Sequence, residues 1–301
     1  MRAAAPPVPR HLLTVRDLEP ESLRALLDLA AVLKARPHGF VEALRGETVV
    51  CFFEKPSTRT RISFAAAAER LGMMPLLVRP DELQLGRGET LEDTARVLSG
   101  YAAAIVVRTF AQETVERLAA AASVPVINAL TDEHHPCQAL ADLLTLRERF
   151  GRLAGLKVAY VGAGTNVARS LLEACALAGI EAVAACPPGY EPSVTGARIV
   201  TDPFEAVAGA HAVYTDVWVS MGEQDSEERR AALAAYQVNG CLLAAARPEA
   251  VFMHCLPAHR GEEVTAEVID GPQSVVWQQA ENRLPTEEAL LYALVTRRWE
   301  T

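Results

Sequence analysis

The sequence predicts an α/β protein with two doubly wound parallel-sheet domains that carry helices on both faces. The chain has 301 residues, 50% of them hydrophobic, which is enough for about two domains with substantial cores. Short apolar runs alternate with helix-like segments, as in parallel sheets whose strands are joined by crossover helices. The runs also lack strict alternation of apolar and polar residues, which indicates strands covered on both faces.

The predicted strands are short runs rich in Val, Ile and Phe. In chain order they are Thr48–Phe53, Ala104–Val107, Val124–Asn128, Lys157–Val161, Glu181–Cys186, Ala212–Val217, Val251–Leu256 and Ser274–Trp277.

The predicted helices lie between these strands. Pro136 suits the first turn of its helix, and Thr286, after Pro285, suits the N-cap of the last one. A fresh strand–glycine–helix unit starts at Gly155, which places a domain boundary near Thr131–Pro136 or within the helix that follows. The helices are Glu21–Arg36, Thr60–Leu71, Thr90–Tyr101, Gln112–Ala122, Pro136–Phe150, Asn166–Ala178, Glu227–Ala235 and Glu287–Arg297.

Composition and charge exclude several classes of protein. A net charge of -9 argues against a nucleic-acid surface, which must be basic. The six cysteines form no C-x-x-C pair, so neither a disulfide scaffold nor a cysteine metal site is indicated. Prolines interrupt the N-terminal segment, and no apolar run reaches the roughly 20 residues of a membrane span. We therefore expect a soluble, cytoplasmic protein with no nucleic-acid or membrane partner.

A polar cluster follows the first predicted strand, within "FEKPSTRTRISF" at Phe53–Phe64. Ser57, Thr58 and Thr60 supply hydroxyl groups where the next helix begins, and helix N-termini attract anions through their N–H groups and the helix dipole. Arg59 can bind a phosphate through its forked guanidinium. An ordinary Ser or Thr cap beside solvated arginines accounts for one capping residue but not for the whole cluster. The stretch fits a phosphate site.

Further polar groups follow the next strands. Arg108 comes directly after Ala104–Val107, where it is either a second cation of a site or a structural residue. His135 and Gln138 lie three residues apart on one face of a helix, and an imidazole and an amide together can bind a carbonyl oxygen and an NH2 group. His134 and His135 lack a third partner for zinc, so we expect no metal. Ligands of doubly wound sheets bind beyond the carboxyl ends of the strands, which favours these positions.

The segment "VGAGTNVARSL" after Lys157–Val161 partly matches the G-x-G-x-x-G dinucleotide motif. Gly162 and Gly164 fit, but Val167 stands in place of the third glycine. The next predicted strand is followed by two prolines rather than by the carboxylate that would bind a ribose. An NAD-dependent oxidoreductase is therefore the weaker alternative. A turn that presents Asn166 to another ligand explains the glycines equally well.

The remaining candidates follow later strands. Asp216 lies at the end of the sixth predicted strand and precedes Ser220 and Met221; an acid and a hydroxyl there suit the ammonium group of an amino acid, although a capped loop is equally consistent. Cys255 lies at the end of the seventh, where a thiol can act as acid, base or nucleophile or simply fill the core. We expect Arg283 in a polar loop between the last strand and the last helix.

Taken in order, these motifs resemble the aspartate/ornithine carbamoyltransferase family over almost the whole chain. Two of them resemble its ornithine branch, because the aspartate branch is arranged differently there: "DVWVSMG" at Asp216–Gly222 and "HCLPAHRGEEV" at His254–Val264. The motifs shared with the family are "STRTR" at Ser57–Arg61, "QLGRGE" at Gln84–Glu89, "RTF" at Arg108–Phe110 and "HPCQALADL" at His135–Leu143.

The resemblance implies transfer of the carbamoyl group of carbamoyl phosphate to the δ-amino group of L-ornithine, giving L-citrulline and phosphate in arginine biosynthesis, without metal or cofactor. It implies catalytic roles for Arg59, His135, Arg283 and Cys255, the last as proton acceptor. The residues implied to bind carbamoyl phosphate are Ser57, Thr58, Arg59, Thr60, Gln84, Arg108, His135, Gln138, Cys255, Leu256 and Arg283. Those implied to bind ornithine are Asn166, Asp216, Ser220 and Met221.

The resemblance also implies how the chain is organised. Residues 1–134, completed by a C-terminal helix at about 285–301, would bind carbamoyl phosphate, and residues 135–284 would bind ornithine. The loop at Gln84 would reach a neighbouring subunit's site, which implies a homotrimer with shared sites.

The glycine turn departs from the family pattern. Ala163 and Thr165 stand where the family usually has an acid and a second asparagine, and Arg169 replaces a common histidine, whereas Asn166 is retained. These changes leave open a carbamoyltransferase for another small amine or a modified ornithine. A non-catalytic homologue is a further alternative, although every catalytic position named above is present.

Overall fold

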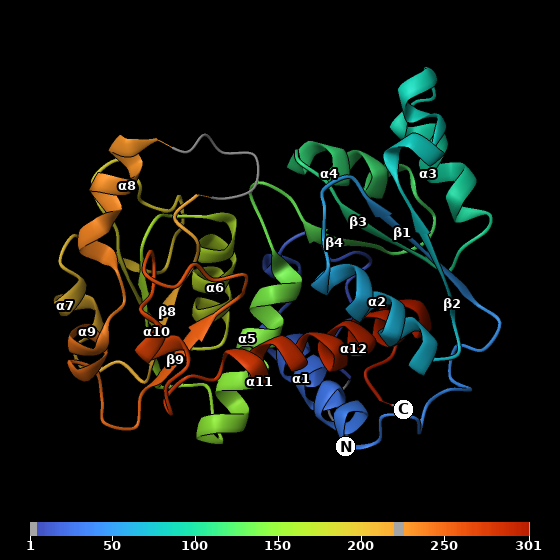
Figure 1. Ribbon diagram of the computed structural model, residues 1–301. Coiled ribbons are helices and arrows are strands. Elements are labelled where there is room, and N and C mark those ends of the chain that lie inside the picture. Colours follow the sequence, from blue (N-terminus) through green and yellow to red (C-terminus); the bar gives the residue numbers. More distant parts are fainter. Residues whose placement is uncertain (1–4, 220–225, 301) are drawn as a thin grey trace. The chain divides into compact units, whose positions relative to one another are not determined.

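The structure is a computed structural model that describes residues 5–219 and 226–300 (Figure 1). The described chain divides into two compact units. The first unit comprises residues up to Leu144 together with those from Asn282 onward, and the second runs from Thr145 to Glu281. The division falls inside helix α5 (Pro136–Phe150). Which substrate each unit binds stays a prediction.

The first unit is built on a four-stranded parallel sheet in the order β2-β1-β3-β4. Helices α3 (Leu91–Ser99) and α4 (Gln112–Ala121) cover one face, where apolar residues of both helices and of three strands form one cluster. Helices α1, α2 and α12 pack together over the opposite face (Figure 1). The other elements are β1 (Thr48–Phe53), β2 (Met74–Val78), β3 (Ala104–Arg108), β4 (Val126–Leu130), α1 (Pro20–Ala35), α2 (Arg59–Arg70) and α12 (Arg283–Thr296).

The second unit has a five-stranded parallel sheet in the order β7-β6-β5-β8-β9. One face packs against α7, α9, α10 and α11 in a continuous hydrophobic cluster. On the other face the rings of Tyr160 and Tyr214 stack, with centroids 6.1 Å apart. The elements are β5 (Lys157–Val161), α6 (Asn166–Leu177), β6 (Glu181–Ala185), β7 (Arg198–Val200), α7 (Pro203–Val207), β8 (Ala212–Thr215), α8 (Glu227–Leu233), α9 (Gly240–Ala244), β9 (Val251–His254), α10 (Ala266–Ile269) and α11 (Val276–Glu281).

Each sheet has a point where the winding direction reverses. In the first unit the chain winds from β1 to β2 and then returns to β3 on the other side of β1. In the second it winds through β5, β6 and β7 and then returns to β8 beside β5. Crevices for ligands form beyond the carboxyl ends of strands at such reversals. We therefore expect a binding site among the segments that follow β1, β3, β5 and β8.

These findings confirm the predicted fold class, but one predicted strand is wrong. Ser274–Trp277 is not a strand of either sheet: Ser274 makes a single bridge with Phe252, and Val276 begins helix α11. A four-residue apolar run cannot be assigned to strand or helix by periodicity alone. Conversely, β2 and the three-residue β7 were not predicted; β2 contains Pro75, which an edge strand tolerates.

The predicted start of the last helix is also wrong. Helix α12 begins at Arg283, so this arginine lies in the first helical turn and is buried, rather than in a polar loop. Pro285 falls within the same turn, where its missing N–H breaks no helical hydrogen bond. Thr286 is not the N-cap, because its hydroxyl donates back to the carbonyl of Asn282.

Within the described residues, no helix combines the length and the hydropathy that a membrane span requires.

Candidate active site

The N-terminus of α2 follows the carboxyl end of β1 and is open to an anion. Thr58 precedes the helix and makes no side-chain cap hydrogen bond, so its hydroxyl does not satisfy the first-turn amides. Thr58 is exposed, and Ser57 and Arg59 are half-buried. Hydroxyls, amides and a guanidinium thus meet at the positive end of a helix dipole, which suits a phosphate.

A buried hydrogen-bonded group lies behind this helix end, within the first unit. Arg283 Nη1 donates to Gln138 Oε1 at 2.9 Å, and Arg283 Nη2 donates to Thr60 Oγ1 at 3.1 Å. Arg108 Nη1 approaches the same Thr60 hydroxyl at 3.5 Å. All four side chains are buried. Thr60, Gln138, Arg108 and Arg283, predicted from four separate motifs, are therefore brought together, and we call them the arginine cluster.

Glu287 supports the arginine cluster from within α12. Its Oε1 accepts hydrogen bonds from Arg283 Nε at 3.1 Å and Nη2 at 2.6 Å, and both residues are buried. Burial raises the pKa of Glu287 to about 7, with Arg283 opposing that shift. The sequence prediction missed Glu287, because in "PTEEALL" it looks like an ordinary surface residue of a helix.

His135 adds an uncharged imidazole to the cationic surroundings. The ring is buried, and burial lowers its pKa well below the usual value, with further lowering by Arg283, Arg108 and Arg59. The imidazole is therefore neutral at neutral pH, when it can donate one hydrogen bond and accept another. Gln138, one turn further along, donates through Nε2 to Asp142 Oδ1 at 2.8 Å, which orients its amide oxygen toward Arg283.

A buried lysine joins the ends of two strands in this region. Lys55 follows β1 and forms an ion pair with Asp132, which follows β4. The ammonium group also lies 4.5 Å from the centre of the Phe110 ring. The sequence prediction did not single out Lys55, although it stands inside the phosphate motif. Its contacts fix the loops that carry Ser57 and His135.

Gln84 lies apart from these contacts. It is exposed on the 3-10 turn Gln84–Arg87. Among the described residues, its side chain makes no hydrogen bond to the arginine cluster. Its predicted place in a neighbouring subunit's site stays a prediction.

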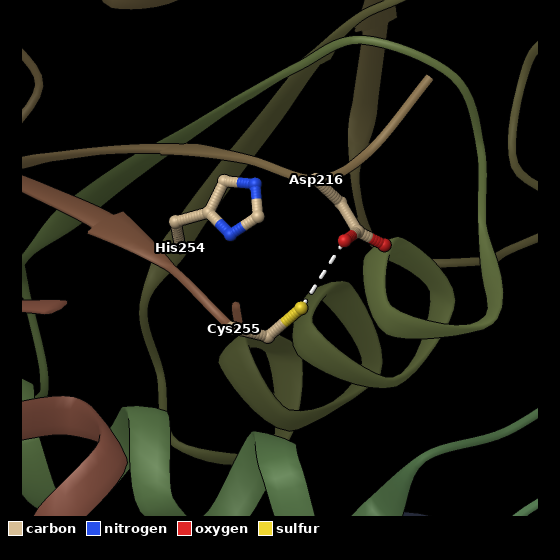
Figure 2. A group of neighbouring side chains, drawn as sticks. All are labelled: Asp216, His254 and Cys255. Carbon is tan, nitrogen blue, oxygen red and sulfur yellow. Dashed lines mark hydrogen bonds between the residues drawn. The ribbon is translucent and has the colours of Figure 1, made fainter. Parts of the chain in front are cut away.

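In the second unit, Asp216 is the centre of a second cluster (Figure 2). Its Oδ1 accepts from Cys255 Sγ at 3.1 Å and from the backbone N–H of Val217 at 2.9 Å. Its Oδ2 accepts from Thr165 Oγ1 at 2.9 Å. Asp216 follows β8, Thr165 follows β5 and Cys255 follows β9, so three neighbouring strand ends deliver these groups. Thr165, which stands out in the sequence only as a departure from the family, caps α6 and orients Asp216.

His254 borders this cluster (Figure 2) and is fully buried. Its Nδ1 accepts the N–H of Leu256 at 2.8 Å, and its Nε2 lies 3.4 Å from Glu263 Oε1. Donor atoms of Asp216, His254 and Cys255 lie within 4.8 Å of one another, which is close enough for a metal ion. However, the Nδ1 lone pair already accepts a backbone N–H, so the ring is oriented for hydrogen bonding. The expectation of no metal site stays a prediction.

The glycine turn after β5 has structural reasons for its glycines. Gly162 has a φ of 134°, which side chains rarely adopt. A Cβ on Gly164 would lie 2.3 Å from the backbone nitrogen of Pro192, and the Gly164 N–H donates to the carbonyl of Tyr190 at 2.7 Å. The loop after β6 thus contacts the turn directly and uses its amide. This contact argues against a dinucleotide pyrophosphate on Gly164.

The other residues predicted for the amino-acid end are less fully defined. Asn166 is the first residue of α6 and half-buried, with its Oδ1 accepting the N–H of Val167. Leu256 is half-buried beside the core of the second unit, with a φ of 60°. Ser220 and Met221 lie outside the described residues.

Both units match known protein families. Residues 10–148 match the family described as aspartate/ornithine carbamoyltransferase, carbamoyl-P binding domain. Residues 154–294 match the aspartate/ornithine carbamoyltransferase, Asp/Orn binding domain.

Relatives and solved structures agree with these matches. The chain is 53% identical to the ornithine carbamoyltransferase of Parafrankia sp. (95% of this chain, 96% of the relative) and 50% identical to that of Bacillus subtilis (95% and 94%). It resembles the solved ornithine carbamoyltransferase of Thermus thermophilus, with a TM-score of 0.90 and 47% identity over 96% of this chain and 99% of that one. The enzyme of Pyrococcus furiosus gives 0.90 and 47% over 95% and 97%.

Proposed function

Since the chain belongs to the aspartate/ornithine carbamoyltransferase family, we propose that it transfers the carbamoyl group of carbamoyl phosphate to the δ-amino group of L-ornithine, giving L-citrulline and phosphate. The observation that supports this function most directly is the arginine cluster beside the neutral His135. Two buried guanidiniums that both approach the hydroxyl of Thr60, beside the amide of Gln138, suit a small anion that also carries a carbonyl and an amide.

Carbamoyl phosphate is assigned to the first unit. Its phosphate would bind the N-terminus of α2 through Ser57, Thr58, Arg59 and Thr60, with Arg108 as a second cation. Its carbamoyl oxygen would accept from His135 and Arg283, and its NH2 group would donate to Gln138. Leu256 and Cys255 are further candidates for binding the carbamoyl group, and Gln84 of a neighbouring subunit would complete the site.

Ornithine is assigned to Asn166, Asp216, Ser220 and Met221. A carboxylate already oriented by three donors, as Asp216 is, suits the ammonium group of an amino acid. The δ-amine has a pKa on the order of 10 in solution and must lose its proton before it can attack.

The reaction then follows from these assignments. The δ-ammonium group first releases one proton to solvent, and the neutral δ-nitrogen then attacks the carbamoyl carbon. A C–N bond forms, the carbonyl oxygen becomes an oxyanion, and the nitrogen is left with a second proton to lose. Preorganised donors on Arg59, His135 and Arg283 would stabilise that charge at little reorganisation cost. The C–O bond to phosphate then breaks, and phosphate leaves with the electron pair. The amine's proton passes to Cys255, as the thiol gives its own proton to Asp216.

The decisive experiment measures citrulline formed from carbamoyl phosphate with ornithine, putrescine, aspartate or N-acetylornithine as acceptor. Product with ornithine as the best acceptor supports the proposal. Product with another acceptor but none with ornithine would sink the assigned specificity. No product with any acceptor would favour a non-catalytic homologue.

We also propose a homotrimer that works in arginine biosynthesis in the cytoplasm. Large apolar side chains on the first unit support association: Ile62, Met74 and Tyr101 are 63%, 61% and 75% exposed. All six cysteines, which lie in the described part of the chain, are free thiols, as expected in a reducing compartment. The mass in solution tests the trimer, and rescue of arginine-requiring cells tests the pathway.

A further inference from the structure

We propose that Glu287 is a positioning residue that fixes the orientation of Arg283 toward carbamoyl phosphate and makes that orientation depend on pH. The inference rests on the proposed function. Its starting point is the pair of contacts that one carboxylate oxygen makes with the Nε and Nη2 groups of Arg283, at 3.1 and 2.6 Å. No family motif named above includes Glu287.

The remaining contacts of Arg283 show what this orientation achieves. A guanidinium carries five N–H donors in a fixed plane. The N–H of Nε and one N–H of Nη2 donate to Glu287, and the other N–H of Nη2 donates to Thr60. One N–H of Nη1 donates to Gln138. The second N–H of Nη1 meets no acceptor among residues 5–219 and 226–300, which leaves it for a ligand. Because the group is rigid and planar, the contact with Glu287 on one edge determines where that N–H points.

Glu287 can hold Arg283 in this way only while it is ionised. The carboxylate is buried within the first unit, and its pKa is raised to about 7 by burial. Arg283 and a hydrogen bond from Ser63 oppose that shift. Below this pH the protonated carboxyl keeps its shape but loses the charge that attracts the guanidinium.

The charged and titratable groups around Glu287 leave Arg283 as its cationic partner. Burial raises the pKa of both neighbouring thiols, Cys51 and Cys137, so these remain neutral. Glu288, the next residue, faces Arg70 instead, at 4.0 Å. The polar and titratable groups on α12 and on the elements around it are Arg283 and Glu288 on α12, Ser63 and Arg70 on α2, Cys51 on β1, Arg108 on β3, Cys137 on α5 and Lys34 on α1, which binds Asn282 just before α12.

The two adjacent glutamates provide a matched pair of variants. Glu287→Gln keeps the shape and one acceptor but removes the charge from the partner of Arg283. Glu288→Gln makes the same change one residue away, in an equally buried side chain that does not contact Arg283. Glu287→Asp keeps the charge on a shorter side chain, and it replaces Glu287→Gln in the test if the glutamine variant does not fold. The measurement is kcat and KM for carbamoyl phosphate, from pH 6 to pH 8.5, with ornithine saturating.

At pH 8 we expect Glu287→Gln to lower kcat/KM roughly tenfold, mostly in kcat, which is less than the 10²–10³-fold cost of losing a transition-state donor outright. The ratio of wild-type to variant kcat/KM should approach 1 at pH 6, where wild-type Glu287 is protonated. Titration of either substrate is common to all proteins and cancels in this ratio. Glu287→Asp should also lower kcat at pH 8, because the shorter side chain cannot reach both donors.

Three results would overturn the inference: an unchanged rate in Glu287→Gln, a ratio that does not vary with pH, or the same pH-dependent loss in Glu288→Gln. The last would indicate a general effect of buried charge in α12. A wild-type protein that forms no citrulline would instead overturn the proposed function and this inference with it, so the two failures are distinguishable.

Discussion

The sulfur of Cys255 lies 3.1 Å from Oδ1 of Asp216 and donates its hydrogen to that carboxylate. The contact joins the carboxyl ends of β9 and β8, which are neighbours in the sheet of the second unit. It gives the proposed proton acceptor a route to pass a proton onward, since the carboxylate can receive the thiol's proton as the thiol receives that of the amine. A thiol that merely filled the core would not need such a partner.

Replacing Cys255 should therefore slow the reaction more than it weakens ornithine binding. We expect Cys255→Ala to lower kcat about 10²-fold or more, the usual contribution of one positioned proton-transfer group. Cys255→Ser should retain more activity, because a hydroxyl can still donate to Asp216. Steady-state kinetics of citrulline formation measure both. Cys241→Ala, at an exposed cysteine, is the control and should leave kcat unchanged. Equal rates for wild type and Cys255→Ala would contradict the relay.

The two half-buried arginines at the start of α2 should differ in function. Arg59→Ala should abolish most carbamoyl-phosphate binding while leaving the fold intact, because Arg59 is expected in the phosphate pocket. Arg61 lies two residues further along and faces another side of the helix, so Arg61→Ala should retain binding. Inhibition by inorganic phosphate and KM for carbamoyl phosphate measure the difference, with thermal unfolding as the check on folding. Normal binding by Arg59→Ala would refute the phosphate assignment.

A shared site can be detected by mixing two inactive proteins. Arg59→Ala and Gln84→Ala should each be nearly inactive alone. If Gln84 serves the neighbouring subunit, a mixed trimer contains one site with both residues intact. Random reassociation of equal amounts of the two variants should then restore about a quarter of wild-type activity in a cyclic trimer. The readout is citrulline formation after dissociation and reassembly. No recovery, with trimers reformed, would place Gln84 outside the neighbour's site.

The sequence predicted the fold class and the strand-end positions of most site residues for one physical reason. Strands covered on both faces must be apolar throughout, so β1, β3, β5, β8 and β9 stand out as short runs, and whatever polar group follows each lies at the binding edge. Arg108, at the last position of β3, and Asp216, directly after β8, were found in this way.

Other features depend on packing that no local pattern encodes. Glu287 looks like a surface residue, but α12 packs against both α1 and α2, so even its glutamates are buried. Pro285 suggested a later helix start, because a proline usually lies near the first position of a helix rather than in the third. Thr165 drew attention only as a departure from the family, since its bond to Asp216 joins residues 51 positions apart.

The close approach at Gly164 predicts that even a methyl group is harmful there. A Cβ would lie 2.3 Å from the nitrogen and 2.5 Å from the Cα of Pro192, and backbone cannot move aside cheaply. Gly164→Ala should destabilise the protein by about 1–3 kcal/mol, as overpacking does. Because Thr165 is the next residue, the shift should also raise KM for ornithine. Gly100→Ala, which meets only Val97 O at 3.4 Å, is the control and should change neither quantity. Unchanged unfolding of Gly164→Ala would mean that the loop after β6 does not lie on the turn.

Glu288 predicts a pH-dependent stability. Burial raises its pKa to about 7 from 4.5, and Arg70 offsets this only in part because its Nη1 is 4.0 Å away. The folded protein therefore binds more protons than the unfolded chain between these two values, so the contribution of Glu288 to stability falls as pH rises through that window.

Glu288→Gln removes this titration. The midpoint of thermal unfolding should be several degrees above wild type at pH 8 and close to wild type at pH 4, because below 4.5 wild-type Glu288 is mostly neutral in both the folded and the unfolded state. The exposed Glu116 on α4 gives the control, since Glu116→Gln should shift neither midpoint. A Glu288→Gln protein that is less stable than wild type at pH 8 would show that the ion pair with Arg70 outweighs the cost of burying the charge.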